Sequence, residues 1–483
     1  MDVAAADSMT LGDPSGLSAT ALLAAYAAKR VTPLAAVTAA LERIDRFNPL
    51  LNAFVRVFGD TALEQARAST ARWESGKPMG ILDGVPVALK DLLLTKGVPT
   101  LRGSFAVDEN QLWDDDAPCV ARLREQGAIM IGKTATAEFG WKGVTDSLRH
   151  GITRNPWNPN LTPGGSSGGS AVAVLARMAA LAVGTDGGGS IRIPAAFTGT
   201  VGFKPTFGRV PAFPSSPVGT IAHLGPIART VEDAALMMAV IGRRDPRDWY
   251  ALPSPPTPYW PLGQLEVERP RVAVVTELWG CGADAEVRRV FESALEVLAK
   301  LGAELAHCDP DWPDIRQSFR IHWQAGAANV LRSIPLDRQE RIEAGLVSGA
   351  REGSNISLAQ FQKAASERER FGTTLNLFFQ EYDFLLTPST AMLPFSVGQE
   401  NPSPSDHSHW LAWAHFSFPF NLSRNPAISI PAGLSDKGLP VGLQIVGPLY
   451  EDQAVLRFAA RLERLLPELP VPDLTPLAVG GNS

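Results

Sequence analysis

From Gly80 onward, short apolar runs alternate with turn residues and with segments long enough to form helices. Residues 85–89 and 128–131 are two such runs, and residues 271–278 (RVAVVTEL) are a third. This alternation is typical of a sheet that helices cover on both faces. The 43 glycines and 39 prolines indicate many tight turns rather than a long helical bundle. The pattern therefore predicts a protein of the α/β class.

Other parts of the chain have helical or connecting character. Residues 17–75 carry apolar side chains at helical spacing, and Thr32 followed by Pro33 predicts the start of a helix. Residues 284–300 predict an amphipathic helix. Residues 252–270 are rich in proline and are expected to be a connector.

Residues 310–420 differ from the rest in being rich in tryptophan and phenylalanine. Their apolar periodicity is weak, although they contain Trp312, Trp323, Trp410 and Trp413. We therefore expect irregular structure over a site rather than a second core.

The composition limits the classes of protein to which this chain can belong. The chain has 483 residues, of which 45% are hydrophobic and 19% are charged. Such a chain buries a full core, so wholesale disorder is excluded. Lysine and arginine number 44 against 50 aspartates and glutamates, which gives a net charge of −6. Because there is also no long basic run, we do not expect a nucleic acid partner.

Cysteine content and the N-terminal sequence bear on the compartment. The three cysteines are odd in number and have no CxxC spacing, which suits a reducing compartment and argues against a disulfide framework. The first ten residues carry acids where a secretory signal needs basic residues. Arg177 interrupts the longest apolar stretch, residues 171–183, which is too short to span a bilayer. We expect a soluble, cytoplasmic protein with no membrane partner.

Residues 127–134 (GAIMIGKT) match the Walker A expression for a phosphate-binding loop. A phosphate cradle needs its four middle residues as an exposed loop whose N–H groups converge on an anion. Here those residues are apolar and predict a strand, whose N–H groups a sheet would use. We therefore reject a nucleotide site and expect Lys133 to be a turn residue.

Residues 164–168 (GGSSG) match the nucleophile elbow GxSxG, with Ser166 at the centre. An elbow needs an apolar strand directly before it. Residues 155–163 (NPWNPNLTP) are instead rich in prolines, which cannot donate to a strand ladder. An α/β-hydrolase-type esterase with Ser166 as its nucleophile stays open as an alternative.

Two glycine-rich loops that carry serines, together with one lysine, are a stronger signal. Residues 162–170 (TPGGSSGGS) lead into an expected helix at 171–182, and residues 184–194 (GTDGGGSIRIP) form the second loop. Three successive glycines before a serine can present several backbone N–H groups to one point, as an oxyanion hole requires. Lys90 ends an apolar strand, where loss of water would lower its pKa and let it act as a base.

These segments resemble the amidase signature family, and in particular its bacterial aryl-amidase and urethanase-type members. The resemblance covers residues 10–250 and 415–465, with matching segments at 81–87 (ILDGVPV), 132–139 (GKTATAEF), 202–209 (GFKPTFGR) and 438–446 (GLPVGLQIV). It implies a single α/β/α domain over residues 1–483, built around a large mixed sheet. Residues 80–210 would be its catalytic core.

The resemblance also implies a Ser–cis-Ser–Lys triad that hydrolyses C–N bonds. By position in the motif, Ser190 would be the nucleophile, Ser166 the bridging cis-serine and Lys90 the base. Serine is a poor nucleophile near neutral pH, so its proton must pass through Ser166 to a neutral Lys90. The same relay, reversed, would protonate the leaving amine.

The rest of the second loop would support this chemistry. The oxyanion donors would be the backbone N–H groups of Gly187, Gly188, Gly189 and Ser190. Gly165 would precede the cis peptide bond, and Asp186 and Arg192 would hold the loop through hydrogen bonds. The resemblance implies no metal and no organic cofactor. Asp406, His407 and His409 could bind a metal, but the two imidazoles stand in a polar loop with no third strong ligand, so we expect no metal there either.

The substrate is expected to be a small-molecule amide. If tryptophans of residues 310–420 line the pocket, they favour bulky or aromatic substrates. A carbamate (urethane) presents the same carbonyl to the triad and is included. One alternative is an amidotransferase component that supplies ammonia together with a partner protein, and another is a binding protein without turnover, against which the intact triad argues. The resemblance is also compatible with a homodimer.

Overall fold

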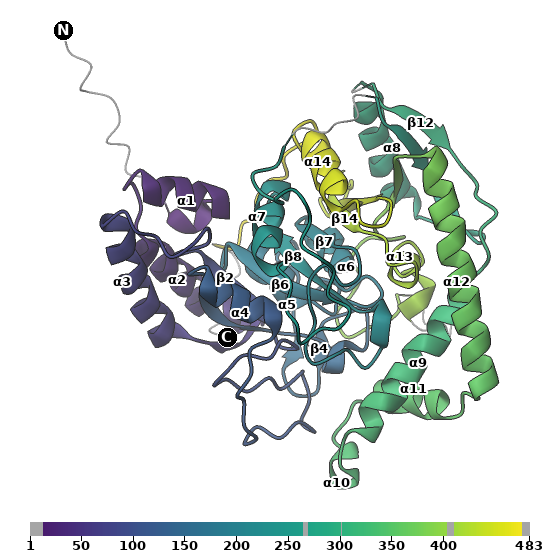
Figure 1. Cartoon of the computed structure of the whole chain (residues 1–483), viewed down its shortest axis with the longest axis horizontal. Coiled ribbons are helices and arrows are strands. Elements are labelled where there is room, and N and C mark those ends of the chain that lie inside the picture. The colour runs from purple at the N-terminus through teal and green to yellow at the C-terminus, as the bar shows by residue number, and fades with distance from the viewer. Residues whose placement is uncertain (1–12, 264–268, 301, 403–409, 476–483) are drawn as a thin grey trace.

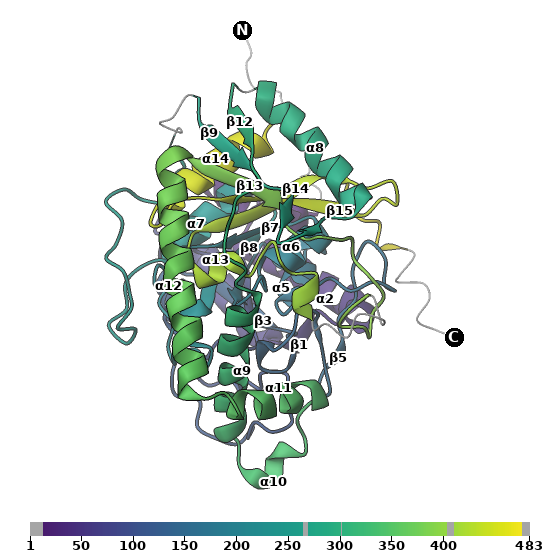
Figure 2. The same ribbon diagram turned by 90° about the vertical axis from the view of Figure 1, so that its right-hand side faces the viewer.

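Eleven strands pair into one sheet within the residues that the structure describes (Figures 1 and 2). The structure is a computed structural model that describes residues 13–263, 269–300, 302–402 and 410–475. Across the sheet the order is β1 Phe54–Val57, β3 Ile129–Thr134, β2 Pro86–Lys90, β6 Leu181–Asp186, β8 His223–Ala228, β7 Val201–Lys204, β14 Ala427–Leu434, β15 Pro440–Val446, β13 Phe384–Pro388, β9 Arg271–Val274 and β12 Glu304–His307. Two small ribbons pair β4 Asp146–Ser147 with β5 Gly151–Ile152, and β10 Glu277–Leu278 with β11 Cys281–Gly282.

The sheet is mixed, as the resemblance implied. The strands β3, β2 and β6 are parallel to one another, and so are β13, β9 and β12. Between these two groups, each strand from β6 through β8, β7, β14 and β15 to β13 pairs antiparallel with the next. At one edge, β1 pairs antiparallel with β3. This edge strand lies inside residues 17–75, where only helices were expected.

Successive residues of the central strands face two different hydrophobic cores. In β2, Val87 and Leu89 belong to one core and Ala88 to the other, and β3 and β6 alternate in the same way. Because side chains on a strand point alternately to opposite faces, both faces of the sheet are buried. This confirms the predicted α/β class.

Helices supply the cover on each face. The core that contains Ala88 is built with α2 Pro33–Leu51, α3 Gly59–Glu74 and α5 Gly168–Leu175, and the other with α1 Ala19–Ala27, α4 Pro118–Glu125 and α7 Val231–Ile241. Three more helices, α6 Arg192–Thr198, α8 Ala285–Lys300 and α14 Asp452–Glu463, pack against β14. Within the described ranges, no helix is long and apolar enough to cross a membrane.

Two predicted helices lie where the sequence placed them, and a third does not. The hydroxyl of Thr32 accepts a hydrogen bond from the backbone N–H of Ala35, and Pro33 is the first residue of α2. The helix expected at residues 284–300 is α8. The helix expected at 171–182 ends at Leu175, and the same apolar run continues into strand β6.

The prediction of irregular structure for residues 310–420 is wrong. This stretch forms α9 Arg316–Arg332, α10 Leu336–Gln339, α11 Ala344–Ser354, α12 Leu358–Glu381 and α13 Pro419–Leu422, together with β13 of the sheet. Because α9 packs against both α11 and α12, its buried residues include Ser318, Gln324 and Gly326 beside Phe319 and Trp323. Burial of small and polar residues blurs the apolar periodicity by which a helix is recognised.

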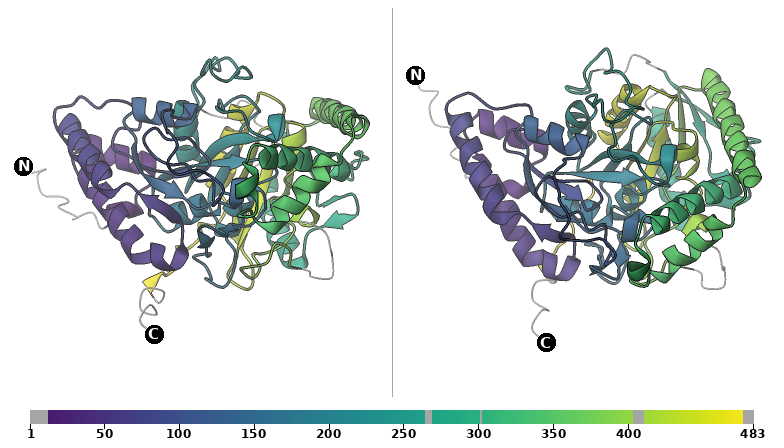
Figure 3. Two further views of the ribbon diagram at one scale, coloured as in Figure 1. Left: turned by 90° about the horizontal axis from the view of Figure 1, so that it is seen from below. Right: turned by 60° about the horizontal axis from the view of Figure 1, so that its bottom comes forward.

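The two flanks of the molecule are made from opposite ends of the sequence. In Figure 3 the purple helices α1, α2 and α3 lie at one end of the sheet, and the green helices α9, α11 and α12 lie at the other. The residues described next come from the end of β2, from the loop between β5 and α5, and from the end of β6 with the loop that follows it.

Candidate active site

Lys90 is the last residue of β2, and its side chain is completely buried. Its Nζ lies within hydrogen-bond distance of three hydroxyl oxygens, 2.7 Å from that of Ser166, 2.9 Å from that of Ser167 and 2.8 Å from that of Thr185. The parallel pairing of β2 with β6 brings Lys90 beside Thr185, because parallel strands end at the same edge of the sheet. One amine therefore joins both glycine-rich loops.

The surroundings of Lys90 disfavour its charged form. Burial holds the pKa of the Lys90 amine well below its ordinary value, and the carboxylate of Asp186 offsets this only in part. No carboxylate forms an ion pair with Lys90 among the described residues. A desolvated amine with no carboxylate in direct contact favours the neutral state.

The first loop packs so tightly that a side chain is excluded at Gly165. A Cβ there would lie 2.3 Å from the carbonyl carbon of Val144. The peptide bond between Gly165 and Ser166 is cis, as the resemblance implied. Residues 156–167 contain no strand, and α5 follows them directly, so this loop lacks the strand that a nucleophile elbow requires.

The second loop is held by a buried ion pair. Both Nε and Nη2 of Arg192 donate to the carboxylate of Asp186, at 3.0 and 2.9 Å. Burial by itself would raise the pKa of the Asp186 carboxyl, but Arg192, Lys204 and Asn421 together outweigh burial and hold that pKa well below its usual range. The same carboxylate accepts the backbone N–H groups of Gly189, at 2.7 Å, and Ile191, at 3.2 Å.

This last contact corrects one expectation. Four N–H groups were expected to face an oxyanion, but that of Gly189 donates to Asp186 instead. Those of Gly187, Gly188 and Ser190 donate to no other group in the part of the chain that the structure describes. The number of available donors is therefore three.

Three further residues complete the support of this loop, and none of them was predicted from the sequence. Arg192 also donates to the backbone carbonyl of Ser417, to Oε1 of Gln444 and to Oδ1 of Asn421. All are buried. The only sequence signal for any of them is that Gln444 lies in the matching segment 438–446.

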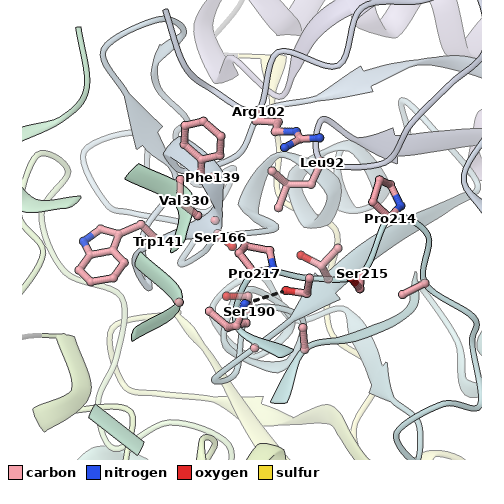
Figure 4. A pocket seen from close by; sticks show the side chains of 18 of the residues that line it. Leu92, Arg102, Phe139, Trp141, Ser166, Ser190, Pro214, Ser215, Pro217 and Val330 are labelled. Carbon is pink, nitrogen blue, oxygen red and sulfur yellow. Dashed lines mark hydrogen bonds between the residues drawn. The ribbon is translucent and has the colours of Figure 1, made fainter. Parts of the chain in front are cut away.

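Ser166, Thr185, Gly187 and Ser190 all line one cavity, of about 190 Å³ (Figure 4). Most of its other walls are apolar, and they come from residues 92–94, 139–141, 212–218 and 222–224, with Arg102, Ala117, Trp323, Gly326, Ala327, Val330 and Leu346. Among the four tryptophans singled out above, Trp323 on α9 lines the cavity. Trp312, Trp410 and Trp413 do not.

Lys133 is not a turn residue, which corrects the expectation for the Walker-like segment. It lies in β3, completely buried, and its Nζ donates to the carbonyl of Leu93 and to the hydroxyls of Thr95 and Thr100. The carboxylate of Asp91 is 3.6 Å away. Residues 129–134 form a strand, as the rejection of a phosphate loop required.

Asp406, His407 and His409 lie outside the described residues. Within the described ranges, no group of three or more histidine, cysteine, aspartate or glutamate side chains could hold a metal ion.

Comparison with known proteins agrees with this geometry. One chain of a glutamyl-tRNA(Gln) amidotransferase from Acidothermus cellulolyticus is 37% identical over 92% of this chain and 94% of its own length. An acylamidase from Rhodococcus erythropolis is 34% identical over 93% and 96%. The crystal structure of a bacterial aryl acylamidase superposes with a TM-score of 0.87 at 29% identity, covering 94% of this chain and 96% of that one. The family model described as Amidase matches residues 35–456, and the chain therefore belongs to the amidase signature family.

Proposed function

We propose that this chain is an amidase that cleaves the C–N bond of bulky or aromatic amides through an acyl-enzyme on Ser190. The observation that carries the proposal is the buried amine of Lys90, which contacts three hydroxyl groups and pairs with no carboxylate among the described residues. A neutral amine can accept a proton, and this one lies in contact with the cis-serine Ser166.

In the proposed reaction the hydroxyl oxygen of Ser190 attacks the amide carbonyl. Its proton passes to Ser166, whose own proton passes to Nζ of Lys90. As the tetrahedral intermediate collapses, the relay runs in reverse and protonates the nitrogen, so that the C–N bond breaks and the amine leaves. Water then attacks the acyl-enzyme with Lys90 and Ser166 as general base.

The N–H groups of Gly187, Gly188 and Ser190 would stabilise the negative oxygen of the intermediate. The role of Asp186 and Arg192 would be to hold these donors in place. Loss of one such donor typically raises the barrier by about 3–4 kcal/mol. Because these donors are backbone groups, the loop conformation maintains them, and no single side chain supplies them.

The apolar cavity supports a bulky or aromatic substrate. Phe139, Trp141, Trp323 and Val330 line it, and an apolar group that leaves water for such walls gains free energy. We extend the proposal to carbamates, because a carbamate presents to Ser190 a carbonyl with a nitrogen leaving group, as an amide does.

The test is release of an aromatic amine from a matched anilide and aryl carbamate. The wild type should turn over the anilide, and Ser190→Ala should lower the rate to below about one-thousandth. Ser215 also lines the cavity, so Ser215→Ala is the matched control and should keep its activity. Unchanged activity in Ser190→Ala would overturn the proposal. The ratio of the two wild-type rates decides whether carbamates are substrates.

A second candidate function is that of an amidotransferase component, which 37% identity to such a protein over 92% of the chain favours. In that role the chain would release ammonia from an amide for a partner protein. The discriminating measurement is ammonia release from glutamine by the chain alone, compared with turnover of the anilide. Faster turnover of glutamine would favour the amidotransferase.

A further inference from the structure

Arg102 brings one positive charge to the wall of the cavity that contains Ser190. It lies on the loop that follows β2 and lines the cavity together with Leu92 and Phe139 (Figure 4). The backbone there is held at two points. The N–H of Arg102 donates to the carbonyl of Asp91 at 3.1 Å, and the N–H of Phe139 donates to the carbonyl of Arg102 at 2.8 Å. The guanidinium is thus carried on a fixed segment.

The guanidinium has no partner within the described part of the protein. Among those residues, Arg102 forms no ion pair, and its side-chain N–H groups donate no hydrogen bond. The carboxylate whose charge acts on Arg102 is that of Asp91, but it accepts the N–H of Leu101 at 3.1 Å and lies 3.6 Å from Nζ of Lys133. Burial lowers the pKa of Arg102, and Asp91 offsets this only in part. The guanidinium nitrogens of this half-buried side chain are not among the buried unpaired atoms, so they face the cavity, where an acceptor on a ligand would replace water.

The rest of the cavity determines which kind of ligand group this charge can bind. Among the described residues that line the cavity, Arg102 is the only lysine, arginine, aspartate or glutamate. Leu92, Leu93, Leu94 and Ala117 lie with it in an otherwise apolar wall. A guanidinium offers a planar set of N–H donors that matches a carboxylate with two parallel hydrogen bonds. Such a pair is strongest where little water competes.

We propose that Arg102 binds a carboxylate on the substrate, and that the preferred substrates are amides with a carboxylate separated from the scissile bond by an apolar spacer. This inference rests on the proposed function, because it takes Ser190 as the place of bond cleavage. The apolar walls would hold the spacer, and Arg102 would select among amides that Ser190 attacks equally well.

The experiment compares carboxylates with their methyl esters, which have nearly the same shape and no charge. One series places the group on the acyl side, as adipic acid mono-4-nitroanilide and its methyl ester. The other series places it on the amine side, as N-hexanoyl-4-aminobenzoate and its methyl ester. In at least one series the wild type should prefer the acid by about 10- to 100-fold in kcat/KM, as expected for a hydrogen-bonded charge pair.

Variants of Arg102 should change this preference. Arg102→Met should abolish it, and Arg102→Glu should turn it toward 6-aminohexanoic acid 4-nitroanilide, which carries a positive charge instead. Arg149 is the matched control, because it donates to the carbonyl of Ser104 near the same loop but does not line the cavity. Arg149→Met removes one positive charge and should keep the preference. Equal kcat/KM of the wild type for acid and ester in both series would overturn the inference. So would an Arg102→Met variant in which kcat/KM for the acid and for the ester falls by the same factor.

Binding without turnover separates this inference from the proposed function. Isothermal titration of Ser190→Ala with the acid and ester of each series should give a Kd ratio that favours the acid and disappears in Ser190→Ala with Arg102→Met. If Ser190→Ala retains turnover, the proposed mechanism fails while the Kd ratio still tests Arg102. If the ratio is one in both series, the inference about Arg102 fails while the mechanism can stand.

Discussion

At the scale of single residues, the hydroxyl groups around Lys90 control how readily its amine takes up a proton. Each hydroxyl oxygen that accepts a hydrogen bond from Nζ stabilises the charged form, whereas burial destabilises it. Since the proposed base must be neutral, kcat/KM is expected to rise with pH through the lowered pKa of Lys90 and to be lost as the pH falls below it.

Thr185→Val provides the test of this balance. It replaces the acceptor hydroxyl with a methyl group of nearly equal size, so the charged form of Lys90 loses a hydrogen bond and its pKa should fall further. The acid limb of the pH–kcat/KM profile should therefore move to lower pH. Thr185→Ser keeps the hydroxyl and should leave the limb in place. A shift toward higher pH in Thr185→Val would contradict the proposed role of Lys90.

At the scale of elements, replacing glycine with alanine is expected to have opposite effects on stability at two helix positions. A Cβ at Gly349 in α11 would lie 2.3 Å from the ring of Trp141, which lines the cavity and stacks on Trp323 at 5.9 Å between ring centroids. Gly349→Ala should cost about 1–3 kcal/mol through overpacking and should raise KM for bulky amides.

Gly372 in α12 has no atom within 4 Å of such a Cβ. Gly372→Ala should therefore stabilise the protein by about 0.5–1 kcal/mol, because alanine loses less backbone entropy in a helix than glycine does. Thermal unfolding midpoints of the two variants check both signs. Equal effects of the two would show that α11 does not press on Trp141.

Glu463, the last residue of α14, makes the contact between α14 and α7 sensitive to pH. Burial raises the pKa of its carboxyl from 4.5 to about 7, although the carboxyl accepts the N–H of Val231 at the start of α7. A raised pKa means that the folded protein binds the proton more tightly than the unfolded chain. The resulting stability is fully present below pH 4.5 and is lost as the pH rises through about 7.

Glu463→Gln should remove this dependence, because its side chain stays neutral and its amide oxygen can still accept the N–H of Val231. The variant should melt at a higher temperature than the wild type at pH 8, with a smaller difference at pH 5. Thermal unfolding at the two pH values measures this. A difference of the same size at both would refute the assignment to Glu463.

At the scale of the whole molecule, one lysine joins the segment before the first glycine-rich loop to the start of α11. Nζ of Lys142 lies 2.5 Å from the carboxylate of Asp146 and 3.4 Å from that of Glu400, and it also pairs with Glu343 at the start of α11. Burial opposes the charge of Lys142, but Asp146 and Glu343 outweigh burial and hold its pKa above its ordinary value. Lys142 and Glu343 are 201 positions apart in the sequence, so their ion pair connects two distant segments of the chain.

Lys142→Met should destabilise the protein by about 3–5 kcal/mol, because it leaves several carboxylates close together without a counter-charge. The matched control is Lys363→Met, which removes an exposed lysine 3.8 Å from Glu367 in α12 and should cost less than about 1 kcal/mol. Urea unfolding compares the two variants. A small effect of Lys142→Met would mean that these carboxylates are already neutral or solvated.

The sequence by itself was enough for what depends on neighbouring residues. The alternation of apolar runs predicted a sheet buried on both faces. The two glycine-rich loops marked Ser166 and Ser190, which line one cavity, and the same constellation included Lys90, whose amine contacts Ser166. Local signals also misled. Lys133 lies in a segment that resembles a turn, but pairing with β2 extends the strand through it. Residues 171–182 are uniformly apolar apart from Arg177. Their apolar periodicity therefore could not show where α5 ends and β6 begins.

Only the tertiary structure decided what depends on residues that are distant in sequence. Arg192 and Gln444 are 252 positions apart, and nothing near either residue indicates the hydrogen bond between them. The hydrogen bond from the N–H of Gly189 to Asp186 could be assigned only from the folded loop. That Arg102 has no partner among the described residues is likewise known only from the positions of the acceptors around it. Periodicity and turn chemistry record the local backbone, whereas burial and the pairing of charges are set by segments that the fold brings together.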